Sequence, residues 1–375
     1  MALPSEKRIV LVGGGTGGHF YPLIAVAEAL RDTRPEAKLY YMGPKRYDEE
    51  ALARLEINFI ACPAGKQRRY RSFRNFIDKF RVLYGSFVAL IKLLILYPDV
   101  IFSKGGYTSV PVVLAAGFLR IPIVVHESDA VPGRANKIGA KFAKYIAIFF
   151  DDVAKYFPEK KTAQVGIPTR KTFFEPVDAR APAELGIDAN RPMIFVTGGS
   201  QGAERINNLI LNSLDELLPH YTIFHQTGPS HAALVQQTAI GLIPNSELLN
   251  RYHVRGHLSG KEFSQALSLA ALVITRGGST TINEIALTGK PSIIIPIPEG
   301  ISHDQRTNAY AYARSGGASV IEEHNLTDNL LTAEITRIMG DTNLYQDMSQ
   351  KAATFAPADA AAKVANVLLE IADSH

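Results

Sequence analysis

The chain has little cysteine and little net charge, and both shortages limit the classes of protein to which it can belong. Its 375 residues include one cysteine, Cys62, so an internal disulfide is impossible and a reducing compartment is favoured. The formal net charge is only +4, too mild to indicate a partner by itself. Hydrophobic residues make up 46% of the sequence, which is ample for the cores of two globular domains.

Several familiar site patterns are also missing. The sequence contains neither a Walker A loop nor a G-x-S-x-G nucleophile elbow. The pairs His225 and His231, and His253 and His257, each lack a third clustered ligand, so we expect no metal site. The opening MALPSEKR runs directly into an apolar segment without a signal-type stretch, and we therefore expect a protein that is not exported.

A glycine-rich loop lies near the start, in RIVLVGGGTGGHFYP at residues 8–22. The apolar run 9–12 predicts a buried strand, and a helical pattern opens at Pro22. Such a loop presents backbone N–H groups and a helix N-terminus, which favour phosphate or diphosphate. The glycine spacing also fits a dinucleotide fingerprint, but the second strand, 38–42, is not followed by the acid that would bind a ribose. NAD or FAD, and a tight turn without a ligand, are the alternatives.

Two passages of the chain occur twice. RIVLVGGGTGGH at position 8 is echoed by PMIFVTGGSQGA at 192, and SKGGYTSVPVVLAAG at 103 by TRGGSTTINEIALTG at 275. Strand and helix patterns alternate throughout, which favours parallel sheets covered by helices on both faces. The expected strands are 9–12, 38–42, 100–102, 123–125, 193–197, 222–226, 272–275 and 292–296. The sequence therefore predicts an α/β fold of two Rossmann-like, doubly wound parallel-sheet domains facing a central cleft.

A basic segment precedes an apolar one between residues 66 and 97. Seven Lys or Arg residues and one Asp lie within 66–81, with aromatic residues interleaved, and 82–97 is almost wholly apolar. The apolar part is shorter than the roughly 20 residues that span a bilayer. Together the two parts fit a surface lying on anionic lipid. The alternatives are a solvated basic face beside a buried helix and, without a recognised motif, nucleic acid.

Groups that could carry chemistry follow the predicted strands. His19 ends the first glycine loop, where an imidazole can take a proton near neutral pH. His126 and Glu127 end another predicted strand, and we expect them at the same edge of the sheet as His19, where the strands end. Glu284 falls in the first turns of the helix that follows Arg276. Its carboxylate could accept hydrogen bonds from a ribose diol, or simply favour the start of a helix.

Seven passages, in this order and spacing, resemble the MurG family of glycosyltransferase family 28. They are GGGTGGHFYP, GGYTSVPVVLAA, HESDAVPGRANK, GIPTR, VTGGSQGAERIN, RGGSTTINEIALTGKPSIIIP and HDQRTNA. The resemblance implies a GT-B fold and an inverting transfer of GlcNAc from UDP-GlcNAc to the C4 hydroxyl of MurNAc in lipid I, giving lipid II for peptidoglycan synthesis without a cofactor or metal. It also implies peripheral binding to the cytoplasmic face of the cell membrane, in agreement with the basic and apolar segment 66–97.

The same resemblance assigns domains and residues. Domain 1–165 would bind the acceptor and the membrane, completed by a C-terminal helix at 357–375, and domain 166–356 would bind UDP-GlcNAc. His19, as the base, and Glu127 would be catalytic. The residues expected at the donor are Thr16, Gly17, Gly18, Asp129, Arg170, Ser200, Gly260, Arg276, Ser279, Thr280, Thr281, Ile282, Asn283, Glu284 and Gln305. Those expected at the acceptor are Gly14, Gly15, Gly105, Gly106, Tyr107, His126 and Asn136.

Within the donor set, the resemblance gives some residues particular roles. Glu284 would bind the ribose hydroxyls, and Gln305 the hydroxyls of GlcNAc. Ser200 and Arg170 would contact the phosphates, while the backbone near Gly260 would read the edge of the uracil ring.

Two positions depart from the family pattern, both near the sugars. Asp129 stands where the HEQN motif of the family has an amide, so a group that donates as well as accepts is replaced by one that weakens binding of an anionic acceptor or serves as a base. Asp304 precedes Gln305 where the family has paired glutamines or histidine and glutamine. The competing interpretations are another GT-B transferase acting on a glycolipid acceptor such as diacylglycerol, a UDP-sugar epimerase, and a non-catalytic UDP-sugar-binding subunit.

Overall fold

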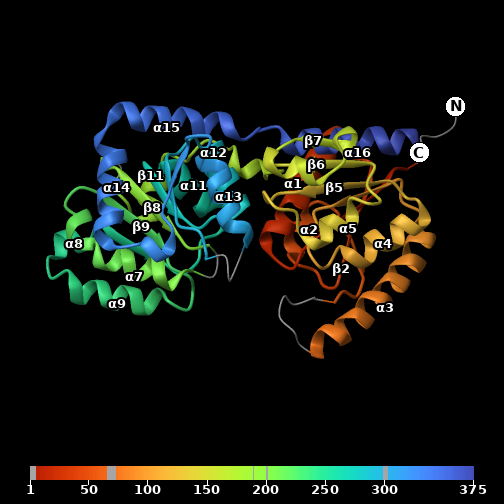
Figure 1. Ribbon diagram of the computed structural model, residues 1–375, viewed down its shortest axis with the longest axis horizontal. Coiled ribbons are helices and arrows are strands. Elements are labelled where there is room, and N and C mark those ends of the chain that lie inside the picture. The colour runs from red at the N-terminus through yellow and green to blue at the C-terminus, as the bar shows by residue number, and fades with distance from the viewer. Residues whose placement is uncertain (1–5, 66–72, 189, 200–201, 299–302) are drawn as a thin grey trace. The chain divides into compact units, whose positions relative to one another are not determined.

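The computed structural model describes residues 6–65, 73–188, 190–199, 202–298 and 303–375, which divide into two compact units (Figure 1). The first unit comprises Met1–Lys171 and Pro357–His375, and the second comprises Thr172–Ala356. Each unit is built on one parallel sheet with helices around it, which confirms the predicted α/β class. The first unit extends to Lys171, whereas we expected a boundary after residue 165. The N–H of Lys171 donates to the Glu28 carboxylate over 3.0 Å, which ties this stretch to the first unit.

The first unit contains a seven-stranded sheet in which all neighbouring strands are parallel. In spatial order its strands are β3 (Asn58–Ala61), β2 (Lys38–Gly43), β1 (Arg8–Val12), β4 (Val100–Ser103), β5 (Ile123–Glu127), β6 (Tyr145–Ile148) and β7 (Thr162–Gln164). Its α-helices are α1 (Gly17–Thr33), α2 (Glu49–Arg54), α3 (Phe73–Leu96), α4 (Val110–Leu119), α5 (Arg134–Gly139) and α16 (Ala360–Ser374). The strand order reverses between β1 and β4, the place where ligands bind in doubly wound sheets.

Strand β1 shows why the first sheet is covered on both faces. Successive side chains of a strand point to opposite sides of the sheet. Ile9 and Leu11 join the core formed with α1 and α16, while Val10 and Val12 join the core formed with α3 and α4. A strand buried on both faces reads as a continuous apolar run, which is why the sequence predicted it.

The second unit repeats this arrangement with six parallel strands. In spatial order they are β10 (Tyr252–Arg255), β9 (Thr222–Gln226), β8 (Met193–Thr197), β11 (Leu272–Thr275), β12 (Ser292–Ile294) and β13 (Ala318–Val320). The α-helices are α6 (Ala181–Leu185), α7 (Glu204–Asn212), α8 (Leu214–Leu217), α9 (Ala232–Leu242), α10 (Ser246–Leu249), α11 (Gly260–Leu269), α12 (Ser279–Leu287), α13 (His303–Ala313), α14 (Asp328–Gly340) and α15 (Thr342–Phe355). Strands β8 and β11 hold the places of β1 and β4. The repeated passages therefore lie on the two strands that flank the reversal in each sheet.

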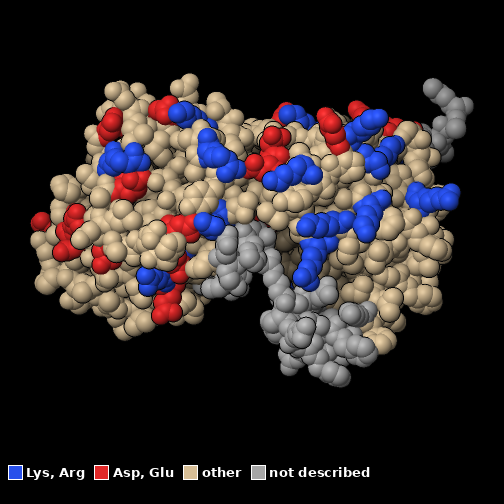
Figure 2. Space-filling view, viewed as in Figure 1, with Lys and Arg blue, Asp and Glu red and all other residues tan. Residues whose placement is uncertain are grey.

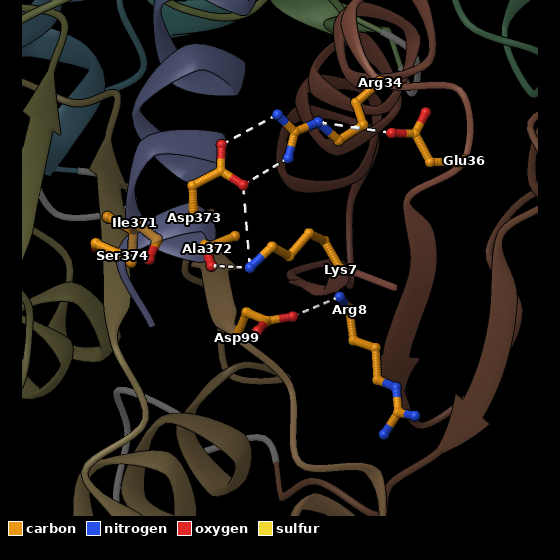
Figure 3. Close-up of polar contacts among 9 residues, drawn as sticks. All are labelled: Lys7, Arg8, Arg34, Glu36, Asp99, Ile371, Ala372, Asp373 and Ser374. Atoms are coloured by element: carbon orange, nitrogen blue, oxygen red, sulfur yellow. Dashed lines mark hydrogen bonds and ion pairs between the residues drawn. The ribbon is translucent and has the colours of Figure 1, made fainter. Parts of the chain in front are cut away.

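Helix α16 belongs to the first unit although it ends the chain, and it lies beside α1 (Figure 1). Lys7 Nζ donates to the carbonyl of Ala372 over 2.6 Å, and Arg34 donates two hydrogen bonds, of 2.6 and 3.0 Å, to the Asp373 carboxylate (Figure 3). Leu368 is fully buried in the core that also contains α1. Polar contacts and core packing together hold the C-terminal helix on this unit.

The start of α1 differs from the prediction. We expected the helix to open at Pro22, but it begins at Gly17, and Pro22 lies inside it. The N–H groups of His19 and Phe20 both reach the carbonyl of Thr16 over 3.2 Å and so form the first turn. Pro22 removes one backbone hydrogen bond farther along. His19 is therefore a residue of the first helical turn and not of the loop.

Five strands were not predicted, and four of them are edges of the two sheets. These are β3 and β7 in the first sheet and β10 and β13 in the second; the fifth is β6. Edge strands are short and partly exposed, so they lack the continuous apolar run of a central strand. Strands β4 and β5 run farther than expected, to Ser103 and Glu127, and β12 ends earlier, at Ile294.

Candidate active site

Three loops meet where β1, β4 and β5 end, and glycines allow them to approach closely. A Cβ added at Gly106 would lie 2.9 Å from the Gly14 carbonyl oxygen and 3.4 Å from the His19 ring. A Cβ added at Gly15 would lie 2.7 Å from the ring of Tyr107. The structure thus brings the predicted glycines of two loops together beside His19.

His19 is the titratable group that borders this rim from α1. Its Nδ1 forms a hydrogen bond of 2.9 Å with the hydroxyl of Thr16, which holds the ring in place. Burial and the nearby charge of Lys104 lower the pKa of His19 to about 4. The imidazole is therefore neutral at pH 7 and able to accept a proton, although a pKa this low makes it a weak base.

Glu127 organises the loop that follows β5. Its side chain is 2% exposed and accepts hydrogen bonds from the N–H groups of Asp129 (3.0 Å) and Gly133 (2.9 Å) and from Nδ2 of Asn136 (2.9 Å). Burial, and then the charge of the half-buried Asp129, raise the pKa of Glu127 above its usual value. A raised carboxyl pKa at a loop rim is typical of groups that exchange protons near neutral pH.

Two residues predicted to touch the acceptor have supporting positions. His126 is completely buried, and its Nε2 donates to the Gly166 carbonyl over 2.7 Å. Asn136 is 5% exposed and donates from Nδ2 to the His126 carbonyl and to Glu127. A Cβ added at Gly105 would lie 2.5 Å from Asn136 Oδ1, so this loop packs on Asn136. Both side chains are buried and hold the end of β5 and the loop after it in place.

Lys104 was not among the predicted site residues. It directly follows β4, is 1% exposed, and donates from Nζ to the Ser128 hydroxyl over 2.8 Å. Burial lowers its pKa to about 8, against the charges of Glu127 and Asp129, which raise it. The signal in the sequence is a lysine between a mostly apolar strand and a glycine pair, in IFSKGG, because a lysine that directly follows a buried strand is covered by the adjoining loops.

Arg170, predicted at the donor phosphates, belongs to the first unit. Its guanidinium carbon lies 4.2 Å from the centre of the Tyr21 ring, a cation–π arrangement that holds the charge beside α1. Thr16 is exposed at the start of the same helix, and Gly17 and Gly18 form its first turn. The predicted Arg170 and the first-turn residues therefore lie around one helix start.

The second unit has an equivalent rim where β8 and β11 end. Gly202 has a φ of +79°, and a Cβ there would overlap the backbone carbonyl of Thr227. Only glycine therefore fits at this position of the loop after β8. The N–H of Gly199 donates to the Thr197 hydroxyl over 3.1 Å, which folds the loop back on the strand end. Ser200, predicted at the phosphates, lies outside the described residues.

Helix α12 presents only part of the predicted donor set. Its half-buried members are Thr280, Thr281 and Glu284. Ser279 is largely buried at the start of the helix, and Ile282 and Asn283 are fully buried. Residues on one helical face recur every three or four positions, so a run of six cannot all face a ligand. The side chains of Ile282 and Asn283 face the interior, and the assignment of these two residues to the donor stays a prediction.

Arg276 and Gln305 differ in whether other groups of the protein already bind the polar atoms of their side chains. Arg276 is 11% exposed, pairs with the Glu323 carboxylate and donates to the Ile295 carbonyl over 3.1 Å, so its charge is balanced inside the unit. Gln305 packs on Gly277, where an added Cβ would overlap the Gln305 carbonyl. Within the described part of the chain, Gln305 Oε1 is buried without a hydrogen-bond partner, which leaves an acceptor for a ligand hydroxyl.

Gly260, predicted near the uracil, begins α11 and is exposed. The preceding Ser259 forms a capping box with Glu262: the Glu262 N–H donates to the Ser259 hydroxyl over 3.2 Å, and the Ser259 N–H donates to the Glu262 carboxylate over 2.8 Å. These bonds fix the helix start and leave the Gly260 backbone accessible.

Helix α3 exposes an apolar stripe. Its strongly exposed side chains are Phe80 (58%), Leu83 (67%), Tyr84 (62%), Phe87 (61%), Ile91 (43%), Leu94 (55%) and Ile95 (79%). They recur with the period of a helix and so share one face. Residues 66–72 of the predicted basic segment lie outside the described residues. No helix within the described ranges combines the length and apolar character needed to cross a membrane.

The unit that carries this stripe also exposes basic residues on and after α5. Helix α4 packs along α3 and also contacts α5. Exposed Lys and Arg residues on and after α5 are Arg134, Lys137, Lys141 and Lys144, and the exposed aromatic rings nearby are Phe118 (77%) and Phe142 (42%). Figure 2 shows a group of Lys and Arg side chains on one part of the first unit, with acidic side chains along its upper edge, and both charge signs on the second unit. Among described residues, no group of three or more His, Cys, Asp or Glu side chains could hold a metal ion.

Known families account for both units. Residues 9–148 match the glycosyltransferase family 28 N-terminal domain, and residues 193–364 match the glycosyltransferase family 28 C-terminal domain. The UDP-N-acetylglucosamine--N-acetylmuramyl-(pentapeptide) pyrophosphoryl-undecaprenol N-acetylglucosamine transferase of Treponema denticola is 36% identical, with 98% of this chain and 96% of that protein covered. The transferase of the same name from Lachnospira eligens is 34% identical, with 90% and 93% covered.

Solved structures agree with the two-domain architecture. MurG of Acinetobacter baumannii superposes with a TM-score of 0.74 at 25% identity, covering 97% of this chain and 99% of that one. A UDP-GlcNAc 2-epimerase from Neisseria meningitidis, solved with UDP-GlcNAc bound, superposes with a TM-score of 0.69 at 13% identity, covering 97% and 100%. The epimerase shows the fold alone. Together these neighbours confirm the GT-B fold.

Proposed function

This chain belongs to glycosyltransferase family 28, and we propose that it transfers GlcNAc from UDP-GlcNAc to the C4 hydroxyl of MurNAc in lipid I, forming lipid II. The observation that carries the proposal is the match to relatives named for this transfer, one of them 36% identical over 98% of the chain. The rims of the two units supply groups suited to the two substrates.

The first unit supplies the groups that an acceptor hydroxyl needs. An inverting transfer requires a base to take the proton of the attacking hydroxyl. His19 is neutral at pH 7 and borders the loops at the ends of β1 and β4. Glu127 and Asp129, at the end of β5, are the other proton acceptors of this rim. We assign the base to His19 because its ring forms a single hydrogen bond within the described residues, to Thr16, whereas the Glu127 carboxylate already accepts three N–H groups.

The second unit supplies the groups that the donor needs. The loop after β8 leads into α7, and a helix start favours the diphosphate of UDP. Glu284, half-buried on α12, accepts hydrogen bonds from the ribose hydroxyls, and the unpartnered Oε1 of Gln305 accepts one from GlcNAc. The guanidinium of Arg170, which the resemblance assigns to the phosphates of the donor, belongs to the first unit, where it lies over the Tyr21 ring. This arrangement requires no metal ion.

The exposed stripe of α3 fits contact with a membrane. Large contiguous apolar surfaces are rare on monomeric proteins and usually mark an interaction site. The same unit exposes lysine and arginine side chains on and after α5, and α4 contacts both α3 and α5; apolar and basic side chains together are a combination that binds anionic lipid. Such contact would place the first unit on the cytoplasmic face of the membrane, where the lipid-linked acceptor is presented.

The decisive assay supplies the purified protein with radiolabelled UDP-GlcNAc and a short-chain lipid I analogue, with diacylglycerol as the alternative acceptor. We expect label in the product of the lipid I analogue alone. Label in diacylglycerol alone would show that the acceptor is diacylglycerol and not lipid I. Binding of UDP-GlcNAc without labelled lipid would favour a non-catalytic subunit, and conversion of UDP-GlcNAc to its epimer would favour the epimerase interpretation.

A further inference from the structure

Lys104 is a buried cation at the centre of the first rim. It is among the largest fully buried side chains of the described residues, and lysine is almost never fully buried unless it is paired. A Cβ added at Gly13 would lie 3.1 Å from Lys104 Cβ and 2.8 Å from the His19 carbonyl oxygen. At its other end, Nζ donates to Ser128 over 2.8 Å. The side chain therefore runs beneath the glycine loop from β4 to the loop after β5.

Two carboxyl groups and two imidazoles interact electrostatically with this ammonium. Burial opposes its charge, whereas Glu127 and Asp129, on β5 and the following loop, favour it. The charge acts on His19 of α1 and on His126 of β5, and in both it adds to burial in lowering the pKa. A single positive charge thus influences groups on three neighbouring elements of the sheet.

Two explanations of this cluster make different predictions. Lys104 could serve only to tie the loop at Ser128, a role that needs a hydrogen bond but no net charge. A buried ion pair is weak support for stability, because desolvation offsets much of the attraction. The cluster contains two acids, Glu127 and Asp129, whose negative charges favour the charged form of Lys104. Charge compensation beside the proton acceptors favours an electrostatic role.

We propose that Lys104 is a positioning residue whose buried charge lowers the pH at which the proton acceptor of the transfer becomes protonated. A positive charge disfavours protonation of an imidazole and of a carboxyl alike, so the effect has the same direction whether His19, Glu127 or Asp129 is the base. The inference rests on the proposed function, since it gives the charge a part in that transfer.

The test uses Lys104→Met, which removes the charge and keeps the approximate length of the side chain. Lys161→Met is the matched control, because Lys161 is an exposed lysine of the same unit that donates to the Ala143 carbonyl over 3.1 Å. The double variant Lys104→Met with Asp129→Asn removes both charges. It keeps the test available if the single variant folds poorly, because no uncompensated carboxylate is added.

The first measurement follows the His19 ring by NMR during a pH titration without substrate, with His19→Gln to assign the signal. We expect the pKa of His19 to rise by about one unit in Lys104→Met, as for other close charge pairs, and to stay unchanged in Lys161→Met. In the double variant it should rise less, because loss of the Asp129 charge acts in the opposite direction. An unchanged pKa in folded Lys104→Met would overturn the proposal.

The second measurement is the pH profile of kcat/KM. We expect the acid limb of Lys104→Met to move to higher pH by about one unit, which is roughly a tenfold loss on that limb and little loss on the plateau. The double variant should return toward the wild-type profile. An equal loss at every pH would show a purely structural role and overturn the proposal. If the NMR shift occurs but the wild type transfers no GlcNAc, the proposed function fails while the electrostatic assignment of Lys104 is supported.

Discussion

The two units share a strand order but differ in the groups at their equivalent rims. In the first unit, Lys104 and Glu127 are buried with shifted pKa values beside His19. In the second, the charge of Arg276 is balanced internally, and Gln305 offers a neutral amide. The topology places a rim at the reversal of each sheet, and in the function we propose the side chains determine whether that rim takes part in proton transfer or binds a sugar nucleotide.

The largest expected effect is a loss of stability caused by a substitution in the glycine loop after β8. Gly202→Ala would combine a φ of +79° with overlap between Cβ and the Thr227 carbonyl, which is backbone and cannot move aside. We expect a loss of about 3 kcal/mol or more in the free energy of unfolding, measured with urea.

Gly199→Ala is the control for that variant. Gly199 also has a positive φ, +87°, but an added Cβ would have no described atom within 4 Å, so only the backbone preference of about 1 to 2 kcal/mol is lost. In the first unit, Gly15→Ala would press on the Tyr107 ring, which is a side chain and can move. Equal losses for Gly202→Ala and Gly199→Ala would show that the overlap with Thr227 is not what restricts the loop.

The exposed apolar residues of the two units give the next comparison. Ile95, 79% exposed on α3, should contribute to membrane binding, whereas Leu234, 66% exposed on α9, should not. We expect Ile95→Glu to weaken binding to vesicles containing anionic lipid by about tenfold or more, because burial of such a side chain contributes roughly 1.5 to 3 kcal/mol. Co-sedimentation measures this partition, and equal weakening by Leu234→Glu would contradict the assignment of the membrane surface to the first unit.

The smallest expected effect concerns exposed ion pairs. Asp373 is half exposed and accepts two hydrogen bonds from Arg34, whereas Asp347 in the second unit forms a single exposed contact of 2.6 Å with Lys351. Each Asp→Asn variant should lower stability by less than about 1 kcal/mol, with the larger loss at Asp373 because its pairing is bidentate.

The pH dependence gives the sign of the Asp373 effect. The hydrogen bond from Arg34 lowers the pKa of Asp373, so its contribution is present above the usual carboxyl pKa and is lost as pH falls through the lowered value. Urea unfolding at a series of pH values should show Asp373→Asn and the wild type converging in acid. A difference that grows in acid would contradict the ion pair.

The sequence predicted the parts of the fold whose residues are buried together. The central strands read as apolar runs, and the glycine loops after β1 and β8 marked the ends where sites form. Edge strands such as β7, with exposed Ala163 and Gln164, gave no such signal. The start of α1 was misplaced because Pro22 is a frequent first-turn residue, whereas the Thr16 carbonyl sets the actual start.

The site was predicted less completely, because partners far apart in sequence decide what a side chain can do. The pairing of Arg276 with Glu323 joins residues far apart in the sequence, so the linear pattern does not reveal it. The linear pattern also does not show that the Ile282 side chain lies on the buried face of its helix. Lys104 was missed because its burial depends on loops from three strands. His19 and Glu127 could be proposed from the sequence because each lies in a motif that follows or ends a predicted strand, and their roles stay predictions.

The division of labour between the units is tested most directly by comparing His19→Ala with Glu284→Ala in donor binding and in turnover. Calorimetric titration with UDP-GlcNAc should give His19→Ala an affinity close to that of the wild type, while its turnover falls by on the order of 10² to 10⁴, as for loss of a general base. Glu284→Ala should bind the donor about tenfold more weakly or worse, because hydrogen bonds to a carboxylate contribute roughly 1.5 to 3 kcal/mol. Near-wild-type turnover in His19→Ala, or undiminished donor affinity in Glu284→Ala, would contradict the account.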